Sequence, residues 1–73
     1  MTKLPGVTPR QASAVLLKAG FEFVRQRGSH RIYVKGEAAV VVPWHGRDLR
    51  KGTLRQIIRQ SGLTPAEFVR LIP

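Results

Sequence analysis

The sequence contains no cysteine, only four acidic residues and no long uninterrupted hydrophobic stretch. The lack of cysteine excludes disulfides and thiolate chemistry. No apolar run approaches the roughly 20 residues of a membrane-spanning helix, and the N-terminus carries no signal-peptide core. We therefore expect a cytoplasmic protein with no membrane partner. With 73 residues it forms a single domain over residues 1–73, which is too small to enclose a deep cavity.

The scarcity of acidic residues leaves the chain strongly basic. Thirteen Lys and Arg residues oppose four Asp and Glu residues, which gives a formal net charge of +9 and a pI near 11.7. So concentrated a positive charge favours RNA, DNA or an acidic protein as the partner. Anionic membranes also attract basic proteins, but the sequence has no long basic amphipathic helix that could lie on one.

Helical periodicity occurs in two main stretches of the sequence and in a short tail. After the lead-in over residues 1–7, Thr8-Pro9 provides the N-cap and first position of a helix that Gly20 ends. A second apolar spacing of three and four residues predicts a helix from about Thr53 to Ser61. Thr64-Pro65 then begins a last short helix through a capping box.

Between the two main helices lie three stretches with the β-branched and aromatic content of strands. They are Phe21–Arg27, His30–Lys35 and Ala38–Val42. Each connection is a two-residue glycine turn, and neighbouring strands must therefore be antiparallel, because parallel neighbours need long crossovers. The predicted fold class is α+β: a two-layer sandwich of a three-stranded antiparallel sheet with helices on one face, in the order α-β-β-β-α plus a short C-terminal helix.

The stretch Arg27-Gly28-Ser29-His30-Arg31 carries the candidate chemistry. Histidine changes protonation near neutral pH, so it can take or give a proton under physiological conditions. A glycine turn suits the junction of two strands, and the arginines in and near this stretch, including Arg25, would attract a polyanion. The combination indicates chemistry on a phosphodiester.

Alternation along the middle strand predicts which side chains face the helices. Ile32 and Val34 are expected to point toward the core, and the open face then receives Arg31, Tyr33 and Lys35. Basic side chains around an aromatic suit contacts with an RNA backbone and a base, with an ordinary solvated surface as the alternative. A regular strand would put His30 on the face of Ile32. If that face is the core, His30 lies at its edge or is turned outward by a bulge at Gly28.

Five short segments occur in a distinctive order along the chain. They are Leu17-Lys18-Ala19-Gly20-Phe21, Gly28-Ser29-His30, Ile32-Tyr33, Val42-Pro43-Trp44-His45, and Lys51-Gly52-Thr53-Leu54 with Ile57. In this order they resemble the HicA family of toxin ribonucleases, also known as YcfA-like proteins. The resemblance implies a fold similar to the double-stranded-RNA-binding domain, cleavage of mRNA without the ribosome, and neutralisation by a HicB-type antitoxin. It also implies that His30 is the catalytic histidine.

Cleavage of RNA needs no cofactor and no metal, because the 2′-hydroxyl is itself the nucleophile. We therefore predict a metal-independent endoribonuclease toxin in which His30 is the general acid or base. The predicted RNA-contacting residues are Arg25, Arg27, Gly28, Ser29, Arg31, Tyr33 and Lys35. Two alternatives remain: an RNA-binding module of the same fold that cuts nothing, and a DNA-binding helix-turn-helix formed by the last two helices.

The loop from Trp44 to Gly52 supplies secondary candidates. His45 could be a second acid or base, a phosphate donor or an ordinary loop histidine. Trp44 is expected to cap the core rather than to stack on a base. A metal site from His30, His45 and Asp48 would lack the tight ligand spacing of known sites, so no metal is predicted.

Overall fold

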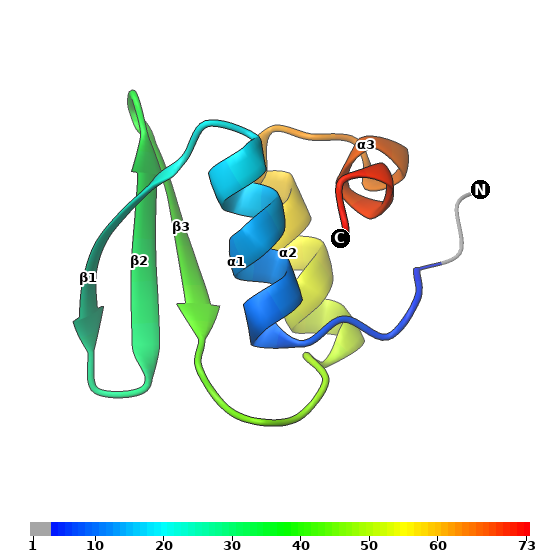
Figure 1. Cartoon of the computed structure of the whole chain (residues 1–73), viewed down its shortest axis with the longest axis horizontal. Helices are drawn as coiled ribbons and strands as arrows, with labels where there is room; N and C mark the ends of the chain where they lie inside the picture. The colour runs from blue at the N-terminus through cyan, green and yellow to red at the C-terminus, as the bar shows by residue number, and fades with distance from the viewer. Residues whose placement is uncertain (1–3) are drawn as a thin grey trace.

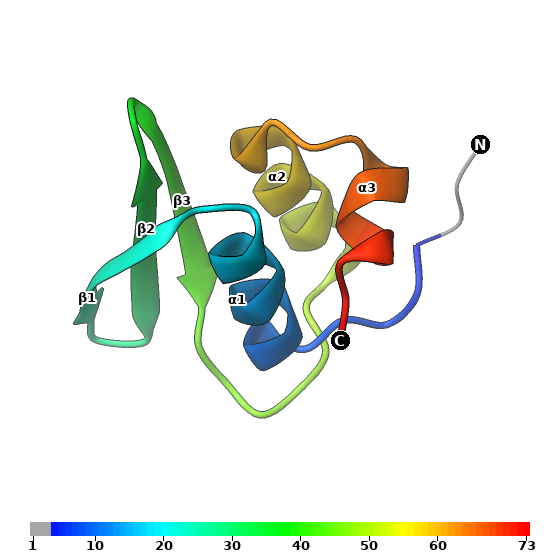
Figure 2. The same cartoon turned by 45° about the horizontal axis from the view of Figure 1, so that its top comes forward.

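The computed structural model describes residues 4–73 and confirms the predicted order of elements. They are α1 (Pro9–Lys18), β1 (Glu22–Arg27), β2 (His30–Lys35), β3 (Ala38–Pro43), α2 (Lys51–Ser61) and α3 (Pro65–Arg70). The strands form one antiparallel sheet in the order β1-β2-β3. α1 and α2 pack on one side of this sheet, and α3 lies beyond them (Figures 1 and 2). The chain is the predicted two-layer α+β sandwich, consistent with a double-stranded-RNA-binding-domain-like arrangement.

Three boundaries differ from the prediction: β1 begins at Glu22 rather than at Phe21, β3 ends at Pro43 rather than at Val42, and the start of α2 also moves. α2 begins at Lys51 rather than at Thr53, so Lys51 and Gly52 form its first turn. The predicted lead-in falls partly outside the described residues, which start at Leu4. None of the helices in the described part of the chain combines the length and hydropathy that a membrane crossing requires.

Threonine caps fix the starts of α1 and α3. The Thr8 hydroxyl accepts a hydrogen bond from the Gln11 backbone N–H at 3.2 Å, and Gln11 Oε1 accepts one from the Thr8 N–H at 2.9 Å. Thr64 and Glu67 form the same capping box at α3. The hydrogen bond from the Thr64 backbone N–H, followed by that from its side chain, lowers the pKa of the Glu67 carboxyl. These reciprocal bonds satisfy N–H groups that a helix start leaves free.

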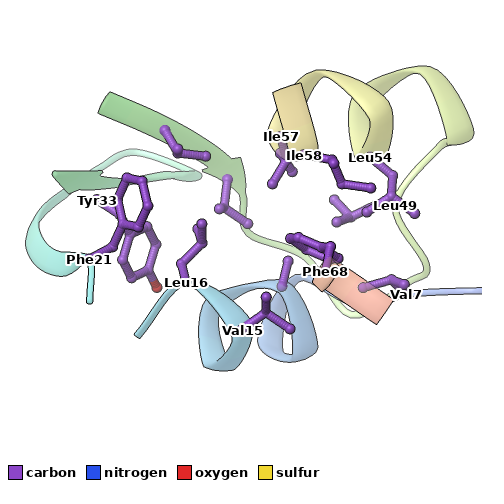
Figure 3. Close-up of a cluster of buried hydrophobic side chains, with 13 residues drawn as sticks. Val7, Val15, Leu16, Phe21, Tyr33, Leu49, Leu54, Ile57, Ile58 and Phe68 are labelled. Atoms are coloured by element: carbon purple, nitrogen blue, oxygen red, sulfur yellow. The ribbon is translucent and has the colours of Figure 1, made fainter. Parts of the chain in front are cut away.

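The core lies between the sheet and the helices and extends to α3 (Figure 3). It consists of Val7, Ala12, Val15, Leu16, Phe21, Tyr33, Val40, Val42, Leu49, Leu54, Ile57, Ile58 and Phe68. The apolar stripes predicted for the two main helices are therefore buried. β1 contributes little to this core, because all six of its residues are exposed.

The two faces of the sheet are the reverse of the prediction. Tyr33 is only 1% exposed and points toward the helices, where its hydroxyl is hydrogen-bonded to the Ser13 hydroxyl of α1. Ile32 and Val34 lie on the open face and are half-buried. The assignment of Arg31, Tyr33 and Lys35 to the open face is therefore wrong.

Arg31 and Lys35 share the inner face with Tyr33. Both can lie there because their long side chains carry the charged groups to the edges of that face. Arg31 Cζ lies 3.7 Å from the centroid of the Trp44 ring. Lys35 Nζ donates a hydrogen bond to the Ala19 carbonyl oxygen, just after α1, at 2.6 Å. Long aliphatic stems can cover apolar surface while their ends remain polar. The prediction assumed that Arg31 and Lys35 face away from the core, and it therefore assigned the wrong face of β2.

The buried pair between Tyr33 and Ser13 leads to a prediction about stability. Tyr33→Phe removes the partner of a Ser13 hydroxyl that is only 8% exposed. We expect a loss of about 1–3 kcal/mol in the free energy of unfolding, because an unpaired buried hydroxyl is costly. Urea denaturation measures this loss. Adding Ser13→Ala removes the unpaired group and should recover part of it, whereas an unchanged unfolding free energy in Tyr33→Phe would contradict the pairing.

Candidate active site

The hairpin between β1 and β2 places His30 at its closing pair. Arg27 pairs with His30 across the two-residue turn Gly28-Ser29. Gly28 has a φ of 59°, whereas Ser29 does not take a positive φ. This combination is typical of a type II′ turn, which requires glycine at its first central position. The Ser29 carbonyl oxygen accepts a hydrogen bond from the Trp44 backbone N–H at 2.6 Å, which joins the turn to the end of β3.

His30 is exposed and lies on the open face, away from the helices. It shares this face with Ile32 and Val34, since alternate residues of a strand point the same way. His30 is therefore exposed without a bulge at Gly28. Arg27 and His30 pair in regular register at that position.

A bulge does occur, but in β1, where the register against β2 shifts between Phe23 and Arg25. Phe23 lies on the inner face with Tyr33, and their ring centroids are 5.6 Å apart. In a regular strand Arg25 and Arg27 would follow Phe23 to that inner face. Arg25 and Arg27 instead lie on the open face, through regular pairing with Ile32 and His30, and the extra residue lets Phe23 face inward.

The register of the hairpin therefore puts two guanidinium groups on the face of the His30 imidazole. Directly paired residues of neighbouring strands have Cβ atoms about 4.5–5.5 Å apart, so Arg27 is an immediate neighbour of His30. Arg25 occupies the next row of the same face, paired with Ile32. On its other side, His30 pairs with Pro43 of β3. The side chains of Arg25, Arg27 and His30 are all exposed.

The loop after β3 returns to the same end of the molecule as the hairpin turn (Figure 1). Here His45 is exposed, and its Nδ1 accepts a hydrogen bond from the Arg47 backbone N–H at 3.1 Å. Together with Asp48 and Arg50, these residues line a hollow in the surface. Over residues 4–73, no three His, Asp or Glu side chains gather as metal ligands would.

This arrangement of hairpin, loop and helices coincides with a match to a known protein family. Residues 9–63 match the family described as HicA toxin of bacterial toxin-antitoxin, a segment that includes α1, the whole sheet and α2. The chain belongs to the HicA toxin family. No curated protein sequence matches it significantly. As a HicA-family protein, the chain is of the toxin type found in bacterial toxin–antitoxin systems.

The structure brings together four of the residues predicted to contact RNA in this HicA-family chain. Arg25, Arg27, Gly28 and Ser29 are exposed at the hairpin beside His30. Their roles toward RNA remain predictions. Arg27 pairs with His30 across the two-residue turn, and Arg25 lies two residues before Arg27, so alternation counted from the turn gives their shared face.

The other three predicted contacts do not belong to this cluster. Arg31 packs on the inner face, with its Cζ 5.3 Å from the Phe23 ring centroid and its Nε donating to Gln26 Oε1 at 3.0 Å. The Tyr33 ring is buried and cannot stack on a base. Lys35 lies five residues from His30 along β2, a distance of about 17 Å at the rise of a strand. These three side chains hold the HicA-family fold together.

Trp44 caps the edge of the core, as predicted. Its ring is partly buried against the core cluster. Two guanidinium groups approach the ring, with Arg31 Cζ at 3.7 Å and Arg10 Cζ at 5.7 Å from its centroid. These cation–π contacts join β2, α1 and the loop, and they fix where the loop leaves the sheet.

Sequence reasoning missed Arg47 and Arg50 as lining residues of the hollow that follows β3. A signal for them was present, because β3 runs antiparallel to β2 and so ends where β2 begins. The segment after Pro43 must therefore start beside His30. Any cation a few residues later is a candidate for the same ligand.

Proposed function

We propose that this HicA-family protein is a metal-independent endoribonuclease that cleaves mRNA, with His30 as general acid or base. One observation carries the proposal: the register across the hairpin turn puts Arg25 and Arg27 on the open face of the sheet with an exposed His30. An imidazole provides proton transfer, and the two guanidinium groups provide positive charge for a crowded phosphate. We place this activity in the cytoplasm, where mRNA is the substrate.

The chemistry uses the substrate's own nucleophile. The ribose 2′-oxygen attacks the adjacent phosphorus, and the bond from phosphorus to the 5′-oxygen breaks. The 2′-hydroxyl loses a proton and the leaving 5′-oxygen gains one, so the products are a 2′,3′-cyclic phosphate and a 5′-hydroxyl. His30 can serve as the base in the first transfer or as the acid in the second. Arg25 and Arg27 would stabilise the additional negative charge on the phosphate oxygens.

This proposal predicts cleavage that is independent of divalent metal. Purified protein incubated with an mRNA should produce fragments that end in cyclic phosphate and begin with a 5′-hydroxyl. We expect the same products with and without EDTA, because the proton transfers and the positive charge both come from side chains. Mapping of the fragment ends gives the readout. Complete dependence on added metal would contradict the mechanism.

The alternative is an RNA-binding module that does not cut. The net charge of +9 favours RNA binding regardless of catalysis. If the protein binds mRNA but leaves it intact in both buffers, this alternative is correct. The DNA-binding helix-turn-helix receives less support, because α3 has only six residues and directs Phe68 into the core.

We propose that a HicB-type antitoxin neutralises the protein by covering the open face of the sheet. This face combines the Arg25 and Arg27 guanidinium groups with apolar side chains, among them Val41 at 41% exposure. It is therefore more apolar than the sequence predicted. A partner surface with acidic groups at one end and apolar groups beside them would complement it and shield His30.

A further inference from the structure

We infer that the hollow lined by His45, Arg47 and Arg50 binds a phosphate of the RNA that neighbours the phosphate cleaved at His30. The inference rests on the proposed function and deepens it by assigning a second subsite for the RNA backbone. The first step is position. Pro43 pairs with His30, and the next residue, Trp44, is hydrogen-bonded to Ser29. His45 follows directly, so the hollow begins one residue after the hydrogen bond that joins β3 to the hairpin turn.

The chemistry of the lining suits a phosphate. The hollow has a volume of about 330 Å³, at the lower end of the range for ligand sites. Its lining residues are all polar or charged, which favours a small anionic group over an apolar one. Arg47 and Arg50 supply guanidinium forks, whose donors match the oxygens of a phosphate.

One carboxylate opposes this charge. Asp48 also lines the hollow. Its side chain packs against Gly6, with Oδ2 2.5 Å from the position that a Cβ on Gly6 would take. One carboxylate against two guanidinium groups leaves the lining with a net positive charge.

The hydrogen bond of His45 defines what its ring can offer. Because Nδ1 accepts from the Arg47 N–H, the proton of the neutral ring resides on Nε2. Nε2 is then a hydrogen-bond donor, as a phosphate oxygen requires. His45 is therefore a phosphate-positioning residue rather than a second base.

The loop that carries these groups is held at both ends. The Trp44 N–H is bonded to the Ser29 carbonyl, and the Leu49 N–H donates to the Val7 carbonyl oxygen at 2.7 Å. The Leu49 side chain is 6% exposed and anchors the loop in the core. Folding therefore already orders the loop backbone, which reduces the entropic cost of binding a ligand there.

Chimeric oligonucleotides test the inference. A single ribonucleotide within a DNA strand leaves one cleavable linkage, and the strand is lengthened by one phosphate at a time on either side. We expect kcat/KM of the wild type to rise on the order of 10-fold when an extension on one side supplies the neighbouring phosphate. In Arg47→Ala and Arg50→Ala this rise should largely disappear. A wild type that gains nothing from extension on either side would overturn the subsite.

Arg59→Ala is the matched control. Arg59 is an exposed cation nine residues after Arg50, or about 13 Å further along α2. The Arg59→Ala substitution removes one positive charge, as the other two do, and should leave the gain in kcat/KM from extension intact. Equal losses in all three arginine variants would show a bulk charge effect and overturn the inference.

Two substitutions of His45 separate positioning from proton transfer. His45→Gln keeps an amide donor near the place of Nε2 but cannot exchange a proton in catalysis, whereas His45→Ala keeps neither. We expect the gain from extension to persist in His45→Gln and to fall in His45→Ala. Loss of cleavage in both variants, on every substrate length, would instead indicate an acid or base and contradict the positioning role.

Binding measurements keep the subsite testable if the wild type cuts nothing. A 2′-O-methyl RNA trinucleotide cannot be cleaved, yet it presents the same phosphates. Its affinity should fall in Arg47→Ala and Arg50→Ala, with a shallower salt dependence, but not in Arg59→Ala. If the wild type does not cleave RNA but the arginine variants show these differences in affinity, only the proposed ribonuclease activity is rejected. Cleavage by the wild type without this pattern would reject only the subsite.

Discussion

His30→Ala is expected to reduce the rate of RNA cleavage by about 10²–10⁴-fold, the contribution of a positioned general acid or base. RNA affinity should change little, because the Arg25 and Arg27 guanidinium groups remain. The side chain is exposed, and its loss should therefore leave folding intact. Single-turnover cleavage and equilibrium RNA binding, measured on the same preparations, separate the two effects. Induced expression should show the same difference as restored growth and intact mRNA.

Glu37→Ala provides the control for this experiment. Glu37 is exposed in the two-residue turn between β2 and β3, at the opposite end of the sheet from His30. Cleavage at the wild-type rate is expected there. If His30→Ala also cut transcripts at that rate, His30 would have no catalytic role. If it lost RNA affinity and cleavage in parallel, its role would be binding.

Much of the fold was predictable because local chemistry determines it. Thr8 and Thr64 carry the caps that begin α1 and α3, and both capping boxes form. Short glycine turns allow only an antiparallel meander, which is the observed sheet. The start of α2 was missed because Gly52 resembles a loop residue, although it lies in the first turn of the helix.

The candidate site was only partly predictable, since it depends on which face each strand shows. β3 is apolar at almost every position, so its own pattern does not reveal which residues face the core. In β2 the inner position belongs to Tyr33, whose hydroxyl has a partner in Ser13. No glycine or proline in the sequence of β1 indicates the bulge at Val24. It determines that Phe23 faces inward with Tyr33 while Arg25 lies on the face of His30.

Phe68→Ala is expected to cause the largest loss of stability among the substitutions considered. Phe68 is fully buried and lies between side chains of α1 and α2 (Figure 3). Truncating a buried Phe typically costs about 3–5 kcal/mol. A domain of this size has roughly 4–11 kcal/mol of stability in total, so the variant should be largely or partly unfolded at physiological temperature. Thermal and urea denaturation followed by circular dichroism measure the loss.

This expectation depends on α3 being part of the domain, although the family match ends at residue 63. Phe23→Ala is the matched control, because it deletes the same ring where the side chain is 47% exposed. We expect it to cost about 0.5–1.5 kcal/mol, the value of its aromatic contact with Tyr33. Similar losses in the two variants would show that α3 does not pack as the structure has it. A much larger loss for Phe68→Ala would establish that the folding unit extends past the family segment, so that a chain shortened to residue 63 should expose the core and fail to fold.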